Sequence, residues 1–195
     1  MTWRGKTRTA LPDQRVHPPI ETGILRTWVG VGGSPESVVR AARYGFPLTL
    51  AIIGGQPQRV RPYVDLYREA LEKFGHRSQP IAVHSPGHVA ATDDQAREQL
   101  WPHYQRKMTR IGGERGWPPV TRTQFDHEAG PGGALCVGSP ATVAAKIINT
   151  ATTLGLSRFD LKYSNGALPH EHALASIELI GREVAPRVRD AVQAS

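Results

Sequence analysis

Short apolar runs alternate along the chain with longer segments whose apolar residues recur every three or four positions. The runs are typical of strands that are buried on both faces, and the periodic segments are typical of amphipathic helices. Strands connected through helices form right-handed crossovers in a parallel sheet. The pattern therefore predicts an α/β fold of parallel strands with helical crossovers. The predicted strands are Arg26–Val31, Pro47–Ile53, Gln79–Ala90 and Arg158–Tyr163.

Local signals set the ends of the predicted helices. Ser34 is a favourable N-cap, Pro35 suits the first helical position, and Gly45 provides the stop of the first helix. A second helix is predicted between the second and third strands, where apolar residues are again spaced by threes and fours. The remaining helices are predicted from Thr92, over Pro140–Leu154 and from about Pro169.

Three segments depart from the simple alternation. Ser85–Gly87 interrupt the third strand, which predicts a bulge or a bend. Residues 112–133 are rich in Gly and Pro and are predicted to form an insertion with one short helix at Thr123–Ala129. Residues 1–25 are predicted to be an extended N-terminal segment. We therefore expect residues 1–195 to form a single domain with one insertion.

The number of strands is unexpectedly small. Four strands are half of those that close a (β/α)8 barrel, which typically needs about 250 residues, and this chain has 195. An open sheet of four parallel strands leaves edges that a closed barrel does not have. The small count raises the expectation that further strands belong to the sheet.

The sequence Gly-Ser-Pro occurs twice, within Gly32–Ser37 and within Gly138–Thr142. A strand that ends in glycines at a helix N-terminus presents free backbone N–H groups and the positive end of the helix dipole, which suits a phosphate. The same residues are also good helix caps, and capping explains the repetition. Only the first copy directly follows a convincing predicted strand, so the second is interpreted as a cap alone. The candidate cofactor-binding residues are Gly32, Gly33, Ser34 and Ser37.

Composition and charge narrow the class of protein. Hydrophobic residues make up 39% and charged residues 21% of the chain, and no apolar run approaches the roughly 20 residues that cross a bilayer. No membrane partner is expected, and the absence of a visible secretory signal favours a cytoplasmic location. The net charge of +7 comes from basic residues that are dispersed among acidic ones. A nucleic-acid partner is therefore not expected.

Four motifs occur in order along the chain: TWVGVGGSPESVVRAARYGFPLTLAIIGG, AVHSPGHVAATDDQA, ALCVGSPATVAAKI and LGLSRFDLKYSNGALPHE. Together they resemble the C-terminal half of the bacterial luciferase-like, flavin-dependent monooxygenases, over nearly the whole chain from about Trp3 to Arg189. The resemblance implies the C-terminal half of a TIM (β/α)8 barrel, with the active site at the carboxyl ends of the strands.

The resemblance also implies chemistry. It indicates a flavin-dependent oxidoreductase in which reduced FMN and dioxygen oxidise a small organic substrate, with a flavin reductase as the electron donor. Sister groups use the deazaflavin F420 instead. In relatives, the glycine and hydroxyl residues after the first strand approach the cofactor phosphate, and these match Gly32, Gly33, Ser34 and Ser37 here.

Relatives carry several strands before the first motif. We therefore expect a truncated or split chain, which assembles as a homo-oligomer or with a chain that carries the missing barrel half. Two other interpretations stay open. One is a non-catalytic remnant or interaction subunit, and the other is a phosphate-binding barrel half with unrelated chemistry.

Few side chains are candidates for reaction chemistry. His84 and His88 flank the Ser-Pro-Gly break and are the candidate catalytic residues for proton handling, although satisfied structural histidines remain the alternative. The sequence His-Glu-His at His170–His172 lacks the i, i+4 spacing of a helical zinc motif, so no metal is expected. Asp160 and Lys162 alternate with Phe159 and Leu161 on the last predicted strand. An ion pair at the strand end is expected for them, and the alternative is that one face of this strand looks into the pocket. Cys136 is expected to be a buried, unreactive thiol.

Overall fold

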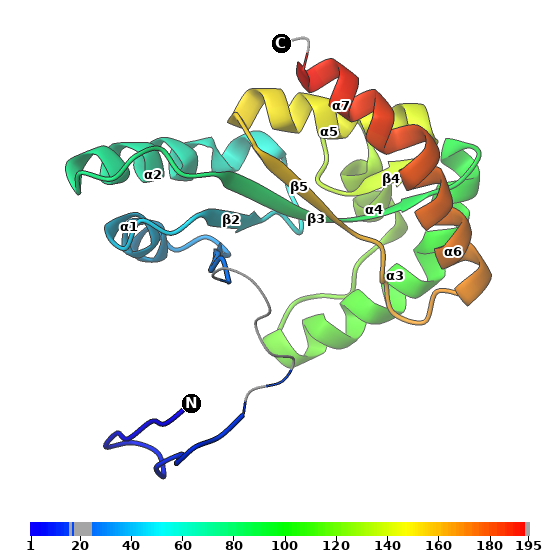
Figure 1. Cartoon of the computed structure of the whole chain (residues 1–195). Coiled ribbons are helices and arrows are strands. Elements are labelled where there is room, and N and C mark those ends of the chain that lie inside the picture. Colours follow the sequence, from blue (N-terminus) through cyan, green and yellow to red (C-terminus); the bar gives the residue numbers. More distant parts are fainter. Residues whose placement is uncertain (16, 18–24, 194–195) are drawn as a thin grey trace.

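The computed structural model describes residues 1–15, 17 and 25–193, and strands and helices alternate along most of them (Figure 1). The strands are β1 (Val29–Val31), β2 (Leu48–Ala51), β3 (Ile81–Val89), β4 (Cys136–Gly138) and β5 (Arg158–Lys162). The helices are α1 (Pro35–Arg43), α2 (Arg61–Lys73), α3 (Asp93–Arg115), α4 (Arg122–Ala129), α5 (Pro140–Leu154), α6 (His170–Leu179) and α7 (Ala185–Gln193). A 3-10 turn (Pro57–Val60) precedes α2, and a π-helical turn (Ile180–Val184) joins α6 to α7.

The strands pair in parallel in one sheet, which confirms the predicted fold class. β2 lies between β1 and β3, and β5 pairs with the other edge of β3. In this register His84 lies opposite Ala51 on one side and Asp160 on the other. The helical crossovers place α1, α2 and α5 on one side of the sheet (Figure 1).

β3 is continuous through Ser85–Gly87, so the prediction that these residues interrupt the strand is wrong. The strand changes its partner there instead. Residues 82–86 pair with β5, whereas residues 87–89 pair with β4. A Cβ on Gly87 would lie 2.5 Å from the Cys136 carbonyl oxygen, so the glycine allows β4 to approach.

β4 also corrects the interpretation of the second Gly-Ser-Pro copy. A short strand does lead into this copy, because β4 ends at Gly138, immediately before the N-cap Ser139. The strand was not predicted because its short apolar run, Ala134–Val137, directly follows the Gly- and Pro-rich insertion. Both copies cap helices as expected: the side chain of Ser34 accepts from the N–H of Ser37, and that of Ser139 from the N–H of Thr142.

The two faces of the sheet differ in character. On the helix-covered face, Leu48, Leu50 and Val83 are fully buried in the largest apolar cluster, which also includes Tyr67 of α2. Because side chains alternate along a strand, their neighbours Thr49, Ala51, His84 and Asp160 share the opposite face. That face carries small and polar side chains, and we call it the barrel-interior face because the resemblance to barrel enzymes implies that it faces inward.

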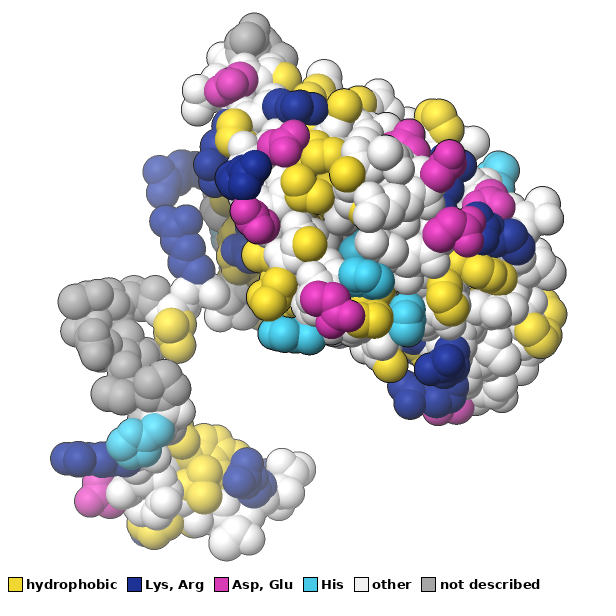
Figure 2. Space-filling view, turned by 90° about the vertical axis from the view of Figure 1, so that its right-hand side faces the viewer, with side chains coloured by type: hydrophobic (Ala, Val, Ile, Leu, Met, Phe, Trp, Pro, Cys, Tyr) yellow, Lys and Arg dark blue, Asp and Glu magenta, His cyan; other side chains and the backbone are white. Residues whose placement is uncertain are grey.

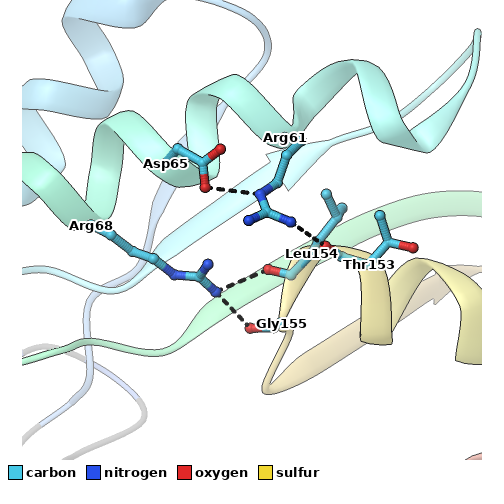
Figure 3. Close-up of polar contacts among 6 residues, drawn as sticks. All are labelled: Arg61, Asp65, Arg68, Thr153, Leu154 and Gly155. Carbon is cyan, nitrogen blue, oxygen red and sulfur yellow. Dashed lines mark hydrogen bonds and ion pairs between the residues drawn. The ribbon is translucent and has the colours of Figure 1, made fainter.

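Two arginines of α2 bind the C-terminal end of α5 (Figure 3). Arg61 Nη1 donates to the carbonyl of Thr153 at 2.9 Å, and Arg68 Nη2 donates to the carbonyls of Leu154 and Gly155 at 3.1 and 3.4 Å. The last carbonyls of a helix lack partners within the helix and attract positive charge. These contacts fix α5, and with it the start of β5, against α2.

The insertion is smaller than predicted, because residues 112–115 complete α3. Its predicted short helix is confirmed by α4, which begins at a capping box formed by Thr121 and Gln124. Lys146 of α5 holds the insertion against this helix. Its amine donates to the carbonyls of Ala129 and Gly130 at 3.1 and 2.6 Å.

The predicted extended segment at residues 1–25 lies partly outside the described residues. Within the described part, Trp3 and Leu11 form an isolated antiparallel bridge. No helix in residues 1–15, 17 and 25–193 has both the length and the apolar composition that crossing a membrane requires.

Candidate functional site

A cavity of about 260 Å³ lies at the carboxyl ends of β1 and β2, and we call it the strand-end cavity. Its walls include the turn after β1, the segment after β2 and the beginning of α2. Ligands of parallel α/β sheets bind at this end of the strands. The residues that line it include Gly32, Gly33, Gly54, Arg59 and Tyr63.

Gly33 shapes the opening of this cavity. Its φ of +128° disfavours residues with a Cβ, and its carbonyl accepts a hydrogen bond from the Tyr63 hydroxyl at 2.9 Å. A Cβ built on Gly33 meets only that hydroxyl, at 4.0 Å, and one built on Gly32 meets nothing within 4 Å. The glycine turn thus leaves open space in which a ligand can approach the backbone.

Arg59 supplies positive charge to the same cavity. Its side chain lines the wall, and among the described residues it takes part in no ion pair. No Asp or Glu side chain among the described residues lines this cavity. An anionic group such as a phosphate therefore suits it, and Arg59 was not predicted from the sequence because it belongs to a dispersed series of charged residues.

Ser34 and Ser37 are engaged elsewhere. The Ser34 hydroxyl donates to the Glu36 carboxylate at 2.7 Å, and the Ser37 hydroxyl accepts from Arg40 at 3.1 Å. The bond from Ser34 lowers the pKa of Glu36, which keeps a negative charge at the helix start. Of the four predicted cofactor-binding residues, the structure brings only Gly32 and Gly33 to the cavity wall.

The two candidate catalytic histidines lie in different surroundings. His84 is partly exposed and lines a second cavity, of about 170 Å³, together with Lys107 and Lys162. His88 is fully buried, and its Nε2 lies 2.8 Å from the Gln99 side-chain oxygen. Burial lowers the pKa of His88, so its ring is held neutral.

Further histidines lie near His88. Burial lowers the pKa of His103, and His172 contributes to the lowered pKa of both rings. Figure 2 shows histidine side chains beside acidic groups near the lower edge of the folded body, on the face that includes α6. Within the described parts of the chain, no group of three or more His, Cys, Asp or Glu side chains is arranged to hold a metal ion.

The sequence also led to predictions for Asp160 and Cys136, and the structure tests both. Asp160 forms its ion pair with Arg158 at 2.8 Å, so the expected pair with Lys162 is wrong. Arg158, Asp160 and Lys162 share one side of β5, and Lys162 lines the second cavity instead of pairing with Asp160. Cys136 is buried as expected, and burial raises the pKa of its thiol to about 11, which keeps it protonated at neutral pH.

Comparison with known proteins identifies the family of this chain. A sequence model described as Luciferase-like monooxygenase matches residues 1–158. The chain belongs to the luciferase-like monooxygenase family. A search of the curated proteins gave no match. The family match agrees with the resemblance noted from the four sequence motifs.

Solved structures of this family share the fold. The oxygenating constituent of 3,6-diketocamphane monooxygenase from Pseudomonas putida, in complex with FMN, has a TM-score of 0.70 and 20% identity, over 96% of this chain and 58% of that one. The monooxygenase RslO1 from Streptomyces bottropensis has a TM-score of 0.65 and 20% identity, over 95% and 55%. An F420-dependent secondary alcohol dehydrogenase has a TM-score of 0.61 and 16% identity, over 97% and 56%.

The chain therefore spans little more than half the length of these structures. These neighbours are luciferase-like TIM-barrel enzymes, and the parallel sheet described above corresponds to about half of such a barrel.

Proposed function

We propose that this chain forms part of a flavin-dependent oxidoreductase that uses reduced FMN and dioxygen to oxidise a small organic substrate. The observation that carries the proposal is the strand-end cavity, in which an open glycine turn and the Arg59 side chain meet at the carboxyl ends of two parallel strands. Membership of the luciferase-like monooxygenase family supports the same reaction class.

The residues present suit a flavin phosphate. Gly32 and Gly33 leave the backbone accessible, and Arg59 neutralises charge, as an anion at a glycine turn requires. Ser34 and Ser37 are also proposed to bind the phosphate. Their hydroxyls would then exchange their present hydrogen-bond partners for phosphate oxygens. Tyr63 holds the Gly33 carbonyl and so fixes the turn.

The two histidines are proposed to have different parts, with proton handling at His84 alone. When bound, the reduced flavin supplies the electrons for dioxygen chemistry. His84 reaches a cavity on the barrel-interior face, so it is the residue proposed to give or take a proton at the substrate. His88 is buried against Gln99, and its proposed part is to keep β3 and α3 in place around that cavity.

Assembly is part of the proposal. Because the chain spans 55–58% of its structural neighbours, we infer that a second copy or a chain carrying the other barrel half covers the part of the barrel-interior face that α3 leaves exposed. A flavin reductase is the proposed electron donor, and a cytoplasmic location is proposed for the complex. The partial coverage also favours a second candidate, a non-catalytic interaction subunit.

Flavin titration tests the proposal. FMN and riboflavin differ only in the phosphate, so fluorescence titration of the chain with each measures the phosphate contribution to binding. We expect FMN to bind about tenfold more tightly or better, as one charged hydrogen bond provides. Titration with F420 distinguishes the alternative cofactor. Failure of FMN and F420 alike to bind favours the interaction subunit.

A further inference from the structure

The second cavity carries a charge arrangement that the phosphate site does not explain. It lies between α3 and the barrel-interior face of β3 and β5, with a volume of about 170 Å³. Lys107, Arg115 and Lys162 line it together with His84, and no Asp or Glu side chain of the described chain does so. We call it the lysine cavity.

The cations of the lysine cavity lack partners of opposite charge. Among the described residues, no ion pair includes Lys107, Arg115 or Lys162. The Lys107 amine has a single weak contact, 3.4 Å from the Asn165 side-chain oxygen. The pKa of Lys107 is lowered, chiefly by burial and then by the like charge of Lys162, which lines the same cavity.

The remaining wall of the cavity is apolar. Met108 and Ile111 of α3 line it with Trp117, and the Arg115 guanidinium lies over the Trp117 ring at 5.1 Å from its centre. A cavity of about 150 Å³ holds one benzene-sized ring. The lysine cavity therefore offers space for a small apolar body beside two amines that lack an anion.

We propose that the lysine cavity binds the substrate, and that the substrate is a small carboxylic acid with an apolar body, its carboxylate between Lys107 and Lys162. This inference rests on the proposed function for its reaction, and it adds the class of substrate. A carboxylate between the two amines relieves their repulsion and forms charge-assisted hydrogen bonds. It also places the apolar body beside His84.

Binding of a matched pair of probes tests the proposal without flavin. Phenylacetate carries the predicted carboxylate, and phenylacetamide is its neutral counterpart. Trp117 lines the cavity, so quenching of tryptophan fluorescence in the full chain reports binding, and Trp117→Phe identifies the signal. We expect saturable quenching by phenylacetate and binding of phenylacetamide that is about tenfold weaker.

Two lysine variants test where the carboxylate of phenylacetate binds. Lys107→Met and Lys162→Met should each weaken phenylacetate binding about tenfold and leave phenylacetamide unchanged. Lys73→Met, at the exposed end of α2, is the matched control and should change neither. Equal binding of the two probes, no saturable quenching by phenylacetate, or unchanged binding in both cavity variants overturns the proposal.

The cofactor is the competing source of an anion. Titration of Lys162→Met with FMN and with riboflavin tests whether the FMN phosphate is that anion. If the phosphate occupies the lysine cavity, the variant binds FMN more weakly and riboflavin unchanged. That result overturns the substrate assignment. We expect both flavin affinities to stay unchanged. The probe experiment needs no flavin. If the proposed flavin-dependent function fails, the binding of phenylacetate can still be measured and still tests the substrate assignment.

Discussion

The carboxylate of Glu128 accepts the backbone N–H of Gly55 through both of its oxygens, at 3.0 and 2.9 Å. Glu128 belongs to α4 in the insertion, and Gly55 follows Gly54 on the wall of the strand-end cavity. The two residues are 73 positions apart in the sequence, so this contact fixes the loop after β2 against the insertion.

Removing the charge of Glu128 should loosen that loop. Glu128→Gln keeps the side-chain size, and we expect it to lower the free energy of unfolding by about 1–2 kcal/mol, because a partly buried hydrogen bond to a charged group is weakened. Amide hydrogen exchange at Gly55 should become faster. Glu114→Gln, an exposed residue of α3, is the control and should change neither quantity.

Lys146 should contribute more to stability than any exposed lysine. Its buried amine donates to carbonyls of the insertion, including that of Gly130, and to the carbonyl of Leu135 just before β4. Lys146→Met keeps the apolar stem but leaves those carbonyls without a donor. We expect a loss of about 2–3 kcal/mol in urea unfolding, whereas Lys73→Met should lose almost nothing. A loss no larger than that of the control would show that water replaces the amine.

Acid should destabilise the fold through His88. Burial lowers the pKa of His88 in the folded chain, so the unfolded chain takes up the proton first as the pH falls. The contribution of His88 to stability is therefore present above its unfolded pKa of about 6.5 and is lost below it. His103, whose pKa is also lowered by burial, acts in the same direction.

Urea unfolding on both sides of pH 6.5 measures this effect. The unaltered chain should lose stability between pH values of about 7.5 and 5.5, and His88→Gln should lose less over the same interval. A pH dependence that is identical in the two proteins would assign the acid sensitivity to other groups.

Self-association follows from the open face of the sheet. Thr49, Ala51 and His84 face the interior of a barrel of which this chain spans about half. We expect sedimentation velocity to show a dimer or a larger assembly, because covering that face removes the open sheet from water. A monomer that persists at high concentration and unfolds cooperatively would contradict this expectation.

Four of the five strands and the capped helices were predictable, because their signals are local. The apolar run around Leu48–Ala51 and the cap at Ser34 show the fold directly in the sequence. β4 is as short as β1, but its apolar run directly follows the Gly- and Pro-rich insertion, where no strand was expected. Pairing of β4 with Gly87 depends on a close approach between distant segments, which only the folded chain reveals.

The candidate site was predictable in part for the same reason. Gly32 and Gly33 belong to a recognisable turn, whereas Arg59 and Lys107 reach their cavities from helices and look like ordinary surface charges in the sequence.

The most direct test of the central claim compares Gly33→Asp with Gly33→Asn. Both variants carry the same strain at a φ of +128° and the same bulk, and they differ only in charge. Flavin fluorescence titration should show FMN binding about tenfold weaker in Gly33→Asp than in Gly33→Asn, with riboflavin bound equally by both. Equal FMN affinities in the two variants would contradict a cofactor phosphate at Gly33.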